Sequence, residues 1–332
     1  MEIEKIIETI QLSQTPYGQI VVGHLFLRPI YFFSKLNIVI EGIENIPDQP
    51  VIFAMNHTDR YNYWPFQFKL WRIHKKYNIK YPYITTWVKG KYYENKWLAR
   101  FMSLTNNIPI PSKGYLLAKD LKEFFKERYP LKKEEFLLLK RYIDGALSLD
   151  ELIKKNIDKI NKIISTKHDN FNPENENYRD YINNLFRRVM KSVYKLNYQA
   201  IYEKNLNITI FPEGTRSKTL TYPKPGLAQI ALALKVPVVP IGCSGSDKAH
   251  PGNSPVPIKN STITYRIGKP IKLHEAYKLN EEFEPFVSYP EEYKKIFEEA
   301  MQLVMSKIAR LVDKEYIGDF TKKSQTDLEN FV

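Results

Sequence analysis

Two short polar stretches carry the side chains with which this sequence could do chemistry. Residues 56–62 read NHTDRYN, and residues 211–217 read FPEGTRS. The first stretch offers His57, whose imidazole titrates near neutral pH and suits a general base. In the second, Arg216 can hold a phosphate through two parallel hydrogen bonds, and Gly214 lets the backbone approach a ligand closely. Together the two stretches predict a site that moves a group onto a phosphate-bearing alcohol.

Each stretch directly follows an apolar run typical of a buried strand. Residues 51–55 precede the first stretch, and the predicted strand 208–211 leads into the second. In open α/β sheets, ligands bind in the crevice at the carboxyl ends of the strands. We therefore expect His57 and Arg216 to meet at one edge of a sheet.

The remaining pattern predicts an α/β fold with a helical insertion. Further strands are expected at residues 37–41, 83–88, 236–241 and 262–267, and residues 108–111, interrupted by prolines, suit an edge strand. Small residues at 227–234 predict a helix, and so does the stretch 290–312, where Ser288 and Glu291 form a candidate capping box. We divide the chain into amphipathic helices (1–35), an α/β domain (36–320) interrupted by helices at 112–198, and a frayed tail (321–332).

Composition points to an anionic partner. The 332 residues are 43% hydrophobic and 26% charged, as in ordinary folded proteins, but the formal net charge is +13. Such an excess suits an acidic membrane surface, a phosphorylated substrate or nucleic acid, and a solvated lysine-rich surface explains it equally well. The one cysteine, Cys243, allows no internal disulfide and fits a reducing compartment.

The N-terminal segment is the part of the sequence best suited to contact a membrane. We expect no signal peptide, because the first residues are charged, and no run reaches the ~18–20 apolar residues that a spanning helix needs. The longest apolar stretch, residues 20–33, carries His24 and Arg28. It suits a helix lying on a membrane surface, or a helix packed on the core.

The second stretch resembles a signature of the phospholipid/glycerol acyltransferase family, whose bacterial lysophosphatidate acyltransferases are the nearest branch. The lead-in at residues 39–47 and 50–52, the Asn56-His57 pair and the strand 236–241 resemble the same family. The resemblance covers roughly residues 25–111 and 195–270. It implies a mixed, mostly parallel central sheet flanked by helices.

The resemblance also implies an activity. His57 would deprotonate the hydroxyl of a lysophospholipid such as 1-acyl-glycerol 3-phosphate, which then attacks the thioester of acyl-CoA or acyl carrier protein. Glu213, Gly214, Thr215 and Arg216 would bind the glycerol phosphate. No metal and no cofactor beyond the acyl donor are expected. The protein would work on the cytoplasmic side of an anionic membrane surface, as a peripheral or monotopic protein.

The sequence departs from the family pattern beside the expected base. Asn62 stands where the family has the aspartate of a His–Asp dyad. Its carbonyl oxygen can still orient the imidazole, but it supplies no charge, and the equivalent loss in a serine protease costs about 10⁴ in rate. Asp59 either caps the following helix or replaces the missing carboxylate, so we place it with His57 and Asn62 in the catalytic set.

The phosphate-binding set departs as well. Where the family usually has a second arginine, this sequence has Ser112, and Lys113 would supply the charge one residue later. These departures leave open a lipid-binding pseudoenzyme of the same fold. A nucleic-acid-binding protein is the remote alternative, because the basic residues are spread along the chain and no nucleic-acid-binding signature is present. We expect no nucleic-acid partner.

Overall fold

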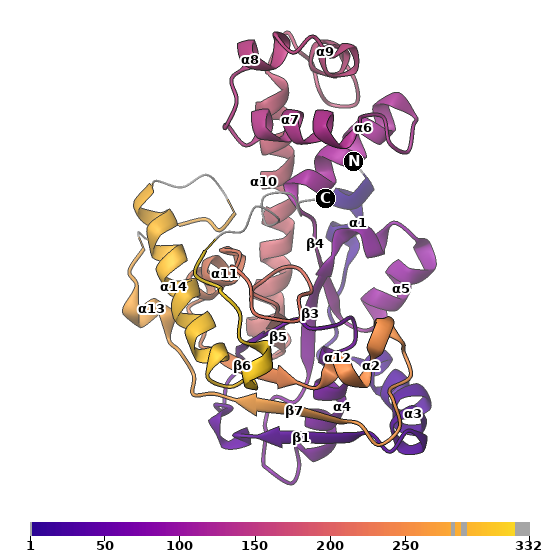
Figure 1. Cartoon of the computed structure of the whole chain (residues 1–332), viewed down its shortest axis with the longest axis vertical. Helices are drawn as coiled ribbons and strands as arrows, with labels where there is room; N and C mark the ends of the chain where they lie inside the picture. Colours follow the sequence, from indigo (N-terminus) through magenta and orange to yellow (C-terminus); the bar gives the residue numbers. More distant parts are fainter. Residues whose placement is uncertain (1, 280–282, 287–290, 323–332) are drawn as a thin grey trace.

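A seven-stranded sheet forms the centre of the molecule (Figure 1). The computed structural model describes residues 2–279, 283–286 and 291–322. The strand order is β1-β7-β6-β2-β5-β3-β4, and all neighbouring strands are parallel except β6 and β7. The strands are β1 (Asn37–Glu41), β2 (Ile52–Met55), β3 (Ile84–Lys89), β4 (Asn107–Ile110), β5 (Asn207–Ile210), β6 (Val238–Ser244) and β7 (Thr262–Ile267).

Helices cover the sheet and extend beyond it. The α-helices are α1 (Glu2–Thr9), α2 (Tyr17–Val22), α3 (Arg28–Phe33), α4 (Tyr63–Ile73), α5 (Lys96–Leu104), α6 (Lys113–Phe125), α7 (Lys133–Ile143), α8 (Leu149–Ile153), α9 (Asp158–Ser165), α10 (Tyr178–Tyr198), α11 (Gly226–Leu234), α12 (Ser246–Ala249), α13 (Leu273–Ala276) and α14 (Glu291–Ala309). The π-helical turns are η1 (Gly23–Leu27) and η4 (Gln199–Glu203). The 3₁₀ turns are η2 (Ile43–Asn45), η3 (Gly90–Tyr93), η5 (Pro251–Asn253) and η6 (Lys314–Tyr316).

The predicted strands are confirmed, each within about three residues of its expected ends. Those that flank the site, β2 and β5, lie side by side in the middle of the sheet and are buried on every residue. Burial on both faces explains their continuous apolar sequences. The proline-containing β4 is an edge strand, as its sequence predicts, because a proline cannot donate to a neighbouring strand.

The helices of residues 112–198 form a second apolar core above the sheet (Figure 1). Helices α7, α8 and α9 pack there, around residues such as Leu139 and Ile160. The long helix α10 belongs to both cores, since Tyr181 lies in the upper one and Val189 in the core against the sheet. α10 therefore packs against both cores.

The N-terminal helices take two different roles. α1 buries Ile3 and Ile7 in the core against the sheet. The segment α2-η1-α3 lies on the outside, with Tyr31 packed inward and several large apolar side chains exposed. α2 approaches α5 so closely that a Cβ on Gly18 would lie 2.1 Å from the Leu104 carbonyl oxygen, which only glycine allows.

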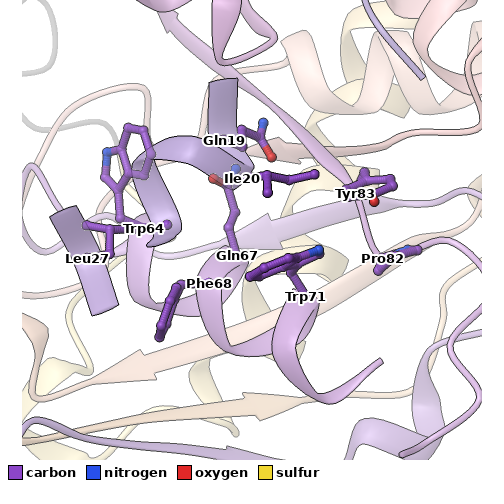
Figure 2. A pocket seen from close by; sticks show the side chains of 10 residues that line it. Gln19, Ile20, Leu27, Trp64, Gln67, Phe68, Trp71, Pro82 and Tyr83 are labelled. Atoms are coloured by element: carbon purple, nitrogen blue, oxygen red, sulfur yellow. The ribbon is translucent and has the colours of Figure 1, made fainter. Parts of the chain in front are cut away.

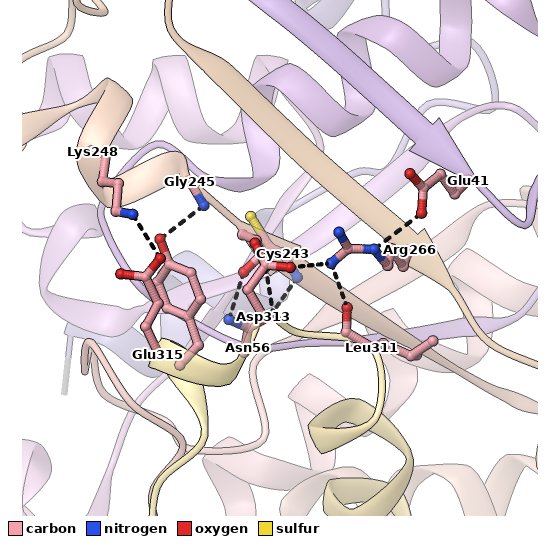
Figure 3. A network of polar contacts seen from close by, with 11 residues as sticks. Glu41, Asn56, Cys243, Gly245, Lys248, Arg266, Leu311, Asp313 and Glu315 are labelled. Atoms are coloured by element: carbon pink, nitrogen blue, oxygen red, sulfur yellow. Dashed lines mark hydrogen bonds and ion pairs between the residues drawn. The ribbon is translucent and has the colours of Figure 1, made fainter.

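A polar network fixes the C-terminal segment across β6 and β7 (Figure 3). The Arg266 guanidinium donates to Glu41, to the Leu311 carbonyl and to Asp313, at 2.8–3.0 Å. Next to it, the Asn56 amide donates to the Cys243 carbonyl and accepts from the Cys243 N–H. These bonds hold the end of β2, one residue before His57, against β6. Ser288 of the predicted capping box and residues 323–332 of the predicted tail lie outside the described residues.

Candidate active site

The two polar stretches meet at the carboxyl ends of β2 and β5, as the sequence predicts. The His57 N–H donates to Glu213 Oε2 at 2.9 Å, and the His57 carbonyl accepts from the Ser217 N–H at 2.9 Å. Parallel pairing of β2 with β5 brings the two strand ends to the same edge of the sheet. The imidazole and the Arg216 block therefore share one site.

Asn62 orients the imidazole of His57. The Asn62 amide nitrogen donates to the Asn56 carbonyl at 2.7 Å, which leaves its Oδ1 as the atom 3.3 Å from His57 Nδ1. An oxygen can only accept, so Nδ1 carries the hydrogen in this arrangement and the lone pair lies on Nε2. The Tyr265 hydroxyl fixes the Asn62 backbone by donating to its carbonyl at 2.5 Å.

The surroundings keep His57 neutral. Burial lowers the pKa of His57 to about 3, the Asn62 bond opposes the shift, and the positive charges of Arg216 and Lys89 reinforce it. The Phe211 ring stacks on the imidazole, with 4.0 Å between ring centres and 17° between planes. At physiological pH the ring is thus uncharged and able to accept a proton.

Glu213 joins the two stretches instead of facing the solvent. Its side chain is buried, and its two oxygens accept from the backbone N–H groups of His57 (2.9 Å) and Thr221 (3.2 Å). Burial raises its pKa to about 7, although both bonds oppose the shift. These bonds hold the His57 backbone next to the second stretch, and the expected contact of Glu213 with glycerol phosphate stays a prediction. Glu213 is a positioning residue.

Gly214, Thr215 and Arg216 form the exposed turn after Glu213. Gly214 has φ +69°, a conformation that favours glycine. Arg216 is exposed, and its Nη1 donates to Asn253 Oδ1 at 2.5 Å. The turn therefore presents a guanidinium to solvent beside His57.

Lys89 is a second cation near the imidazole, and sequence reasoning missed it. It ends β3, which pairs with β5, and it faces solvent. Desolvation is the largest cause that lowers the pKa of Lys89. The charges of Lys91 and Arg216 lower it further, which indicates that these three cations lie close together. The available signal was a lysine directly after the predicted strand 83–88.

Asp59 does not take either expected role. Its Oδ1 accepts from the Tyr61 N–H at 2.7 Å and its Oδ2 from the Thr58 hydroxyl at 3.0 Å. The prediction that Asp59 caps the following helix is wrong, because the residue at the N-cap of α4 is Asn62. Both carboxylate oxygens are used within the turn, so Asp59 closes an Asx turn and does not orient His57.

Lys113 begins α6 and lies next to Asp144 at the end of α7 and Phe186 of α10. Its Nζ lies 3.5 Å from Asp144 and 5.7 Å from the centre of the Phe186 ring. Ser112 caps α6 by accepting from the Tyr115 N–H at 3.1 Å. Asp144 also binds Lys140 at 2.5 Å, so it does not neutralise Lys113 alone, and the expected contact of Lys113 with phosphate stays a prediction.

A small apolar pocket lies between the N-terminal helices and α4 (Figure 2). Trp64, Phe68 and Trp71 line it from α4, and Ile20 and Leu27 from the opposite side. Its volume of about 20 Å³ leaves room for roughly one water molecule. We assign this pocket a packing role.

An exposed apolar surface, which we call the apolar face, runs from the N-terminal helices to α5. The side chains that form it are all more than one third exposed: Tyr17, Val21, Leu25, Phe26, Phe32, Phe33, Trp97, Phe101 and Leu104. The Phe101 ring lies 6.2 Å from Trp64, Trp64 lies 5.3 Å from Tyr63, and Tyr63 lies 6.1 Å from Phe211. Aromatic rings thus connect the apolar face to the ring stacked on His57.

Among the described residues, no helix combines the length and the apolar character needed to span a bilayer. Within that same part of the chain, no three His, Cys, Asp or Glu side chains gather as a metal site would require.

Comparison with known proteins identifies the segment that holds Arg216. Residues 174–244, from the loop before α10 to the end of β6, match the family model described as Acyltransferase. This segment is similar to the acyltransferase family. The matched segment contains the Glu213–Arg216 turn and does not contain His57.

Two individual relatives were also found. A stretch of 76 residues is 42% identical to a 1-acyl-sn-glycerol-3-phosphate acyltransferase of Cocos nucifera, and it covers 22% of this chain and 24% of that acyltransferase. The crystal structure of the 1-acyl-sn-glycerophosphate acyltransferase PlsC from Thermotoga maritima aligns over 92% of this chain and 94% of that chain. The sequence identity there is 15% and the TM-score 0.37, too low to support a shared detailed architecture.

Proposed function

We propose that this acyltransferase-family protein transfers a fatty acyl group from a thioester, acyl-CoA or acyl carrier protein, to the hydroxyl of a lysophospholipid such as 1-acyl-glycerol 3-phosphate. The observation that carries the proposal is the oriented, neutral His57 beside two cations. Its Nδ1 is engaged by Asn62, and its Nε2 has no hydrogen-bond partner among the described residues. A neutral imidazole fixed in this way suits a general base.

The proposed reaction balances without further groups. His57 Nε2 takes the proton of the acceptor hydroxyl as the oxygen attacks the thioester carbonyl carbon. The tetrahedral intermediate then collapses, the carbon–sulfur bond breaks, and the sulfur leaves as a thiolate that takes the proton from the imidazolium. The products are the acylated lipid and a free thiol. Because Asn62 carries no charge, the imidazolium formed on the way depends on other groups for stabilisation.

The phosphate of the acceptor would supply that stabilisation. Arg216 and Lys89 both lower the pKa of His57, so an anion bound between them offsets their effect. The same contact holds the substrate and makes the base stronger. Arg216 grips through a planar fork and Lys89 through a point charge.

Membrane association belongs to the same proposal. A lysolipid resides in a bilayer, and the apolar face ends at the aromatic rings that lead to His57. We propose that the apolar face rests on an anionic membrane surface at its cytoplasmic side. Contiguous exposed apolar surface of this kind marks a membrane or protein contact.

An acyl-transfer assay on the purified protein tests the proposal. Lysophosphatidate, glycerol 3-phosphate and neutral lysolipids are each combined with acyl-CoA and acyl carrier protein donors. We expect transfer to lysophosphatidate and weaker transfer to acceptors without the phosphate. Binding of lysophosphatidate without transfer from any donor would instead favour the lipid-binding pseudoenzyme, which the uncharged Asn62 suggests.

A further inference from the structure

A basic hollow lies at the end of α4 that is remote from His57. Its volume is about 230 Å³, and it is lined by His24, Arg28, Phe68, Trp71, Arg72, His74 and Lys75. Phe68 is the α4 residue of the hollow nearest to Asn62, and at about 1.5 Å of rise per residue roughly 9 Å of helix separate the two. The hollow is thus separate from the proposed catalytic site.

The walls of the hollow combine cations with aromatic rings. Arg28, Arg72 and Lys75 are exposed, and within the described residues no carboxylate forms an ion pair with any of them. The Arg72 guanidinium lies 5.6 Å from the centre of the Phe68 ring, and His24 meets Trp71 edge-on at 5.0 Å. Arg72 also stabilises α4 at its C-terminus, where the helix dipole is negative. That effect does not explain why Arg28, from α3, lines the same hollow.

The hollow adjoins the apolar face. Arg28 begins α3, and His24 lies in η1, on the same helical segment as the exposed Leu25 and Phe26. A water molecule takes about 30 Å³ in the liquid, so a hollow of about 230 Å³ has room for a phosphate group and its attached atoms. If the apolar face rests in the acyl region of a bilayer, the cations of the hollow lie at headgroup depth.

We propose that this hollow binds the phosphate headgroup of an anionic bilayer lipid that is not a substrate. Arg28 and Arg72, from two different helices, hold the phosphate between them, and Lys75 adds a third positive charge. The bound lipid orients the protein so that the aromatic path from the apolar face to His57 faces the bilayer. This proposal rests on the membrane association proposed above.

Vesicle binding tests the site with a matched control. The double variant Arg28→Gln/Arg72→Gln removes the two cations, and Lys35→Gln/Lys76→Gln removes two exposed cations nearby that do not line the hollow. Vesicles contain phosphatidylcholine alone or with about 20% phosphatidylglycerol, a composition that attracts basic segments. A further arm adds inorganic phosphate or glycerol 3-phosphate as a soluble competitor.

We expect the vesicle partition coefficient of the wild type to rise when phosphatidylglycerol is added. Arg28→Gln/Arg72→Gln should reduce this rise at least tenfold more than Lys35→Gln/Lys76→Gln does. Acyl transfer to a detergent-dispersed acceptor should be equal in both variants. Equal losses of vesicle binding would overturn the site while leaving membrane association intact. Effective competition by millimolar soluble phosphate would overturn the lipid as occupant. Failure of the wild type to bind any vesicle would refute membrane association itself, and the site with it.

Discussion

His57 is a weak base in the ligand-free protein, and two cations account for part of that weakness. Burial lowers its pKa to about 3, with Arg216 and Lys89 contributing. A base with so low a pKa is neutral near physiological pH, so the concentration of the neutral form does not limit the reaction. The rate is limited instead by the small driving force for proton transfer from the acceptor hydroxyl to His57.

Removing one of these cations should raise the pKa of His57. For Lys89→Gln we expect an upward shift of the His57 pKa, together with weaker binding of lysophosphatidate. Because the base must be neutral, kcat/KM of the wild type should not fall on account of His57 between pH 7 and pH 5. NMR titration of the imidazole and a pH profile measure both effects. Lys91→Gln, which alters the charge one step further away, provides the control. An unchanged His57 pKa in Lys89→Gln would contradict the electrostatic coupling.

Asn62 is matched to its surroundings as an amide. Its Nδ2 donates to the Asn56 carbonyl, and an aspartate there would place an oxygen 2.7 Å from that carbonyl. For Asn62→Asp we therefore expect a loss of about 1–3 kcal/mol in the free energy of unfolding. We also expect about a threefold to tenfold gain in transfer rate, because a carboxylate raises the pKa of the base. Denaturant unfolding and the acyl-transfer assay check the two effects. A lower rate in a folded variant would mean that the position of the imidazole matters more than its charge.

The residues of the site differ in how far their sequence reveals their roles. His57 and Arg216 were predictable because both follow buried strands that the structure confirms. The roles of Glu213, Asp59 and Lys113 were not, since a side chain of any of these types can face a ligand or the protein. Only the three-dimensional positions of Thr221, Tyr61 and Asp144 show which groups these side chains contact.

At the scale of elements, a buried carboxylate holds the upper helical core to α6 and α10. Asp120 of α6 accepts from the Tyr178 hydroxyl at 2.6 Å, from the Tyr181 hydroxyl at 3.2 Å, and lies 3.1 Å from His168 Nε2. The other ring nitrogen of His168 lies 2.7 Å from the Thr166 carbonyl. Both nitrogens therefore face acceptors, which suits the protonated imidazole.

The free energy of unfolding should depend on pH through this network. Burial lowers the pKa of His168, but the bonds to Asp120 and Thr166 outweigh it, and the net shift is upward. A pKa raised in the folded state adds stability below the unfolded value of about 6.5, and this is lost as pH rises through the folded value. For Asp120→Asn we expect a loss of about 3 kcal/mol at pH 6, and a smaller loss at pH 8. Thermal or urea unfolding of wild type and Asp120→Asn at pH 6 and pH 8 measures this difference. A loss of the same size at both pH values would show that His168 is not charged. The raised pKa values of Glu123 and Glu213 also make the free energy of unfolding depend on pH. Because wild type and Asp120→Asn both contain these residues, the difference between the two proteins is the quantity to compare.

The elements themselves were largely predictable. Parallel strands buried on both faces have apolar runs that stand out in sequence, as in residues 51–55 and 236–241. Hydrophobic periodicity does not show which part of the protein packs against a given helix face. The pattern of α10 shows an apolar stripe, but not that Tyr181 and Val189 face two different cores.

At the scale of the whole molecule, the apolar face should determine how the protein meets a bilayer. Phe32 and Phe33 are 74% and 75% exposed, so replacing them with serine should change the free energy of unfolding by no more than about 0.5 kcal/mol. We expect the double variant to bind neutral vesicles at least tenfold more weakly, because it loses apolar surface that a bilayer would bury. Tyr129→Ser is the control, being 78% exposed but distant in sequence from the apolar face, on the loop before α7. Unchanged vesicle binding in the double variant would assign the apolar face to another partner.

The most direct test of the proposed chemistry is the rate of acyl transfer to lysophosphatidate by His57→Ala compared with wild type. The side chain of His57 stacks on Phe211 and is not needed for the backbone bonds to Glu213 and Ser217, so the variant should stay folded. We expect its rate to fall by about 10²–10⁴, the usual contribution of a general base. Full activity in a folded His57→Ala variant would contradict the assignment of His57 as the base.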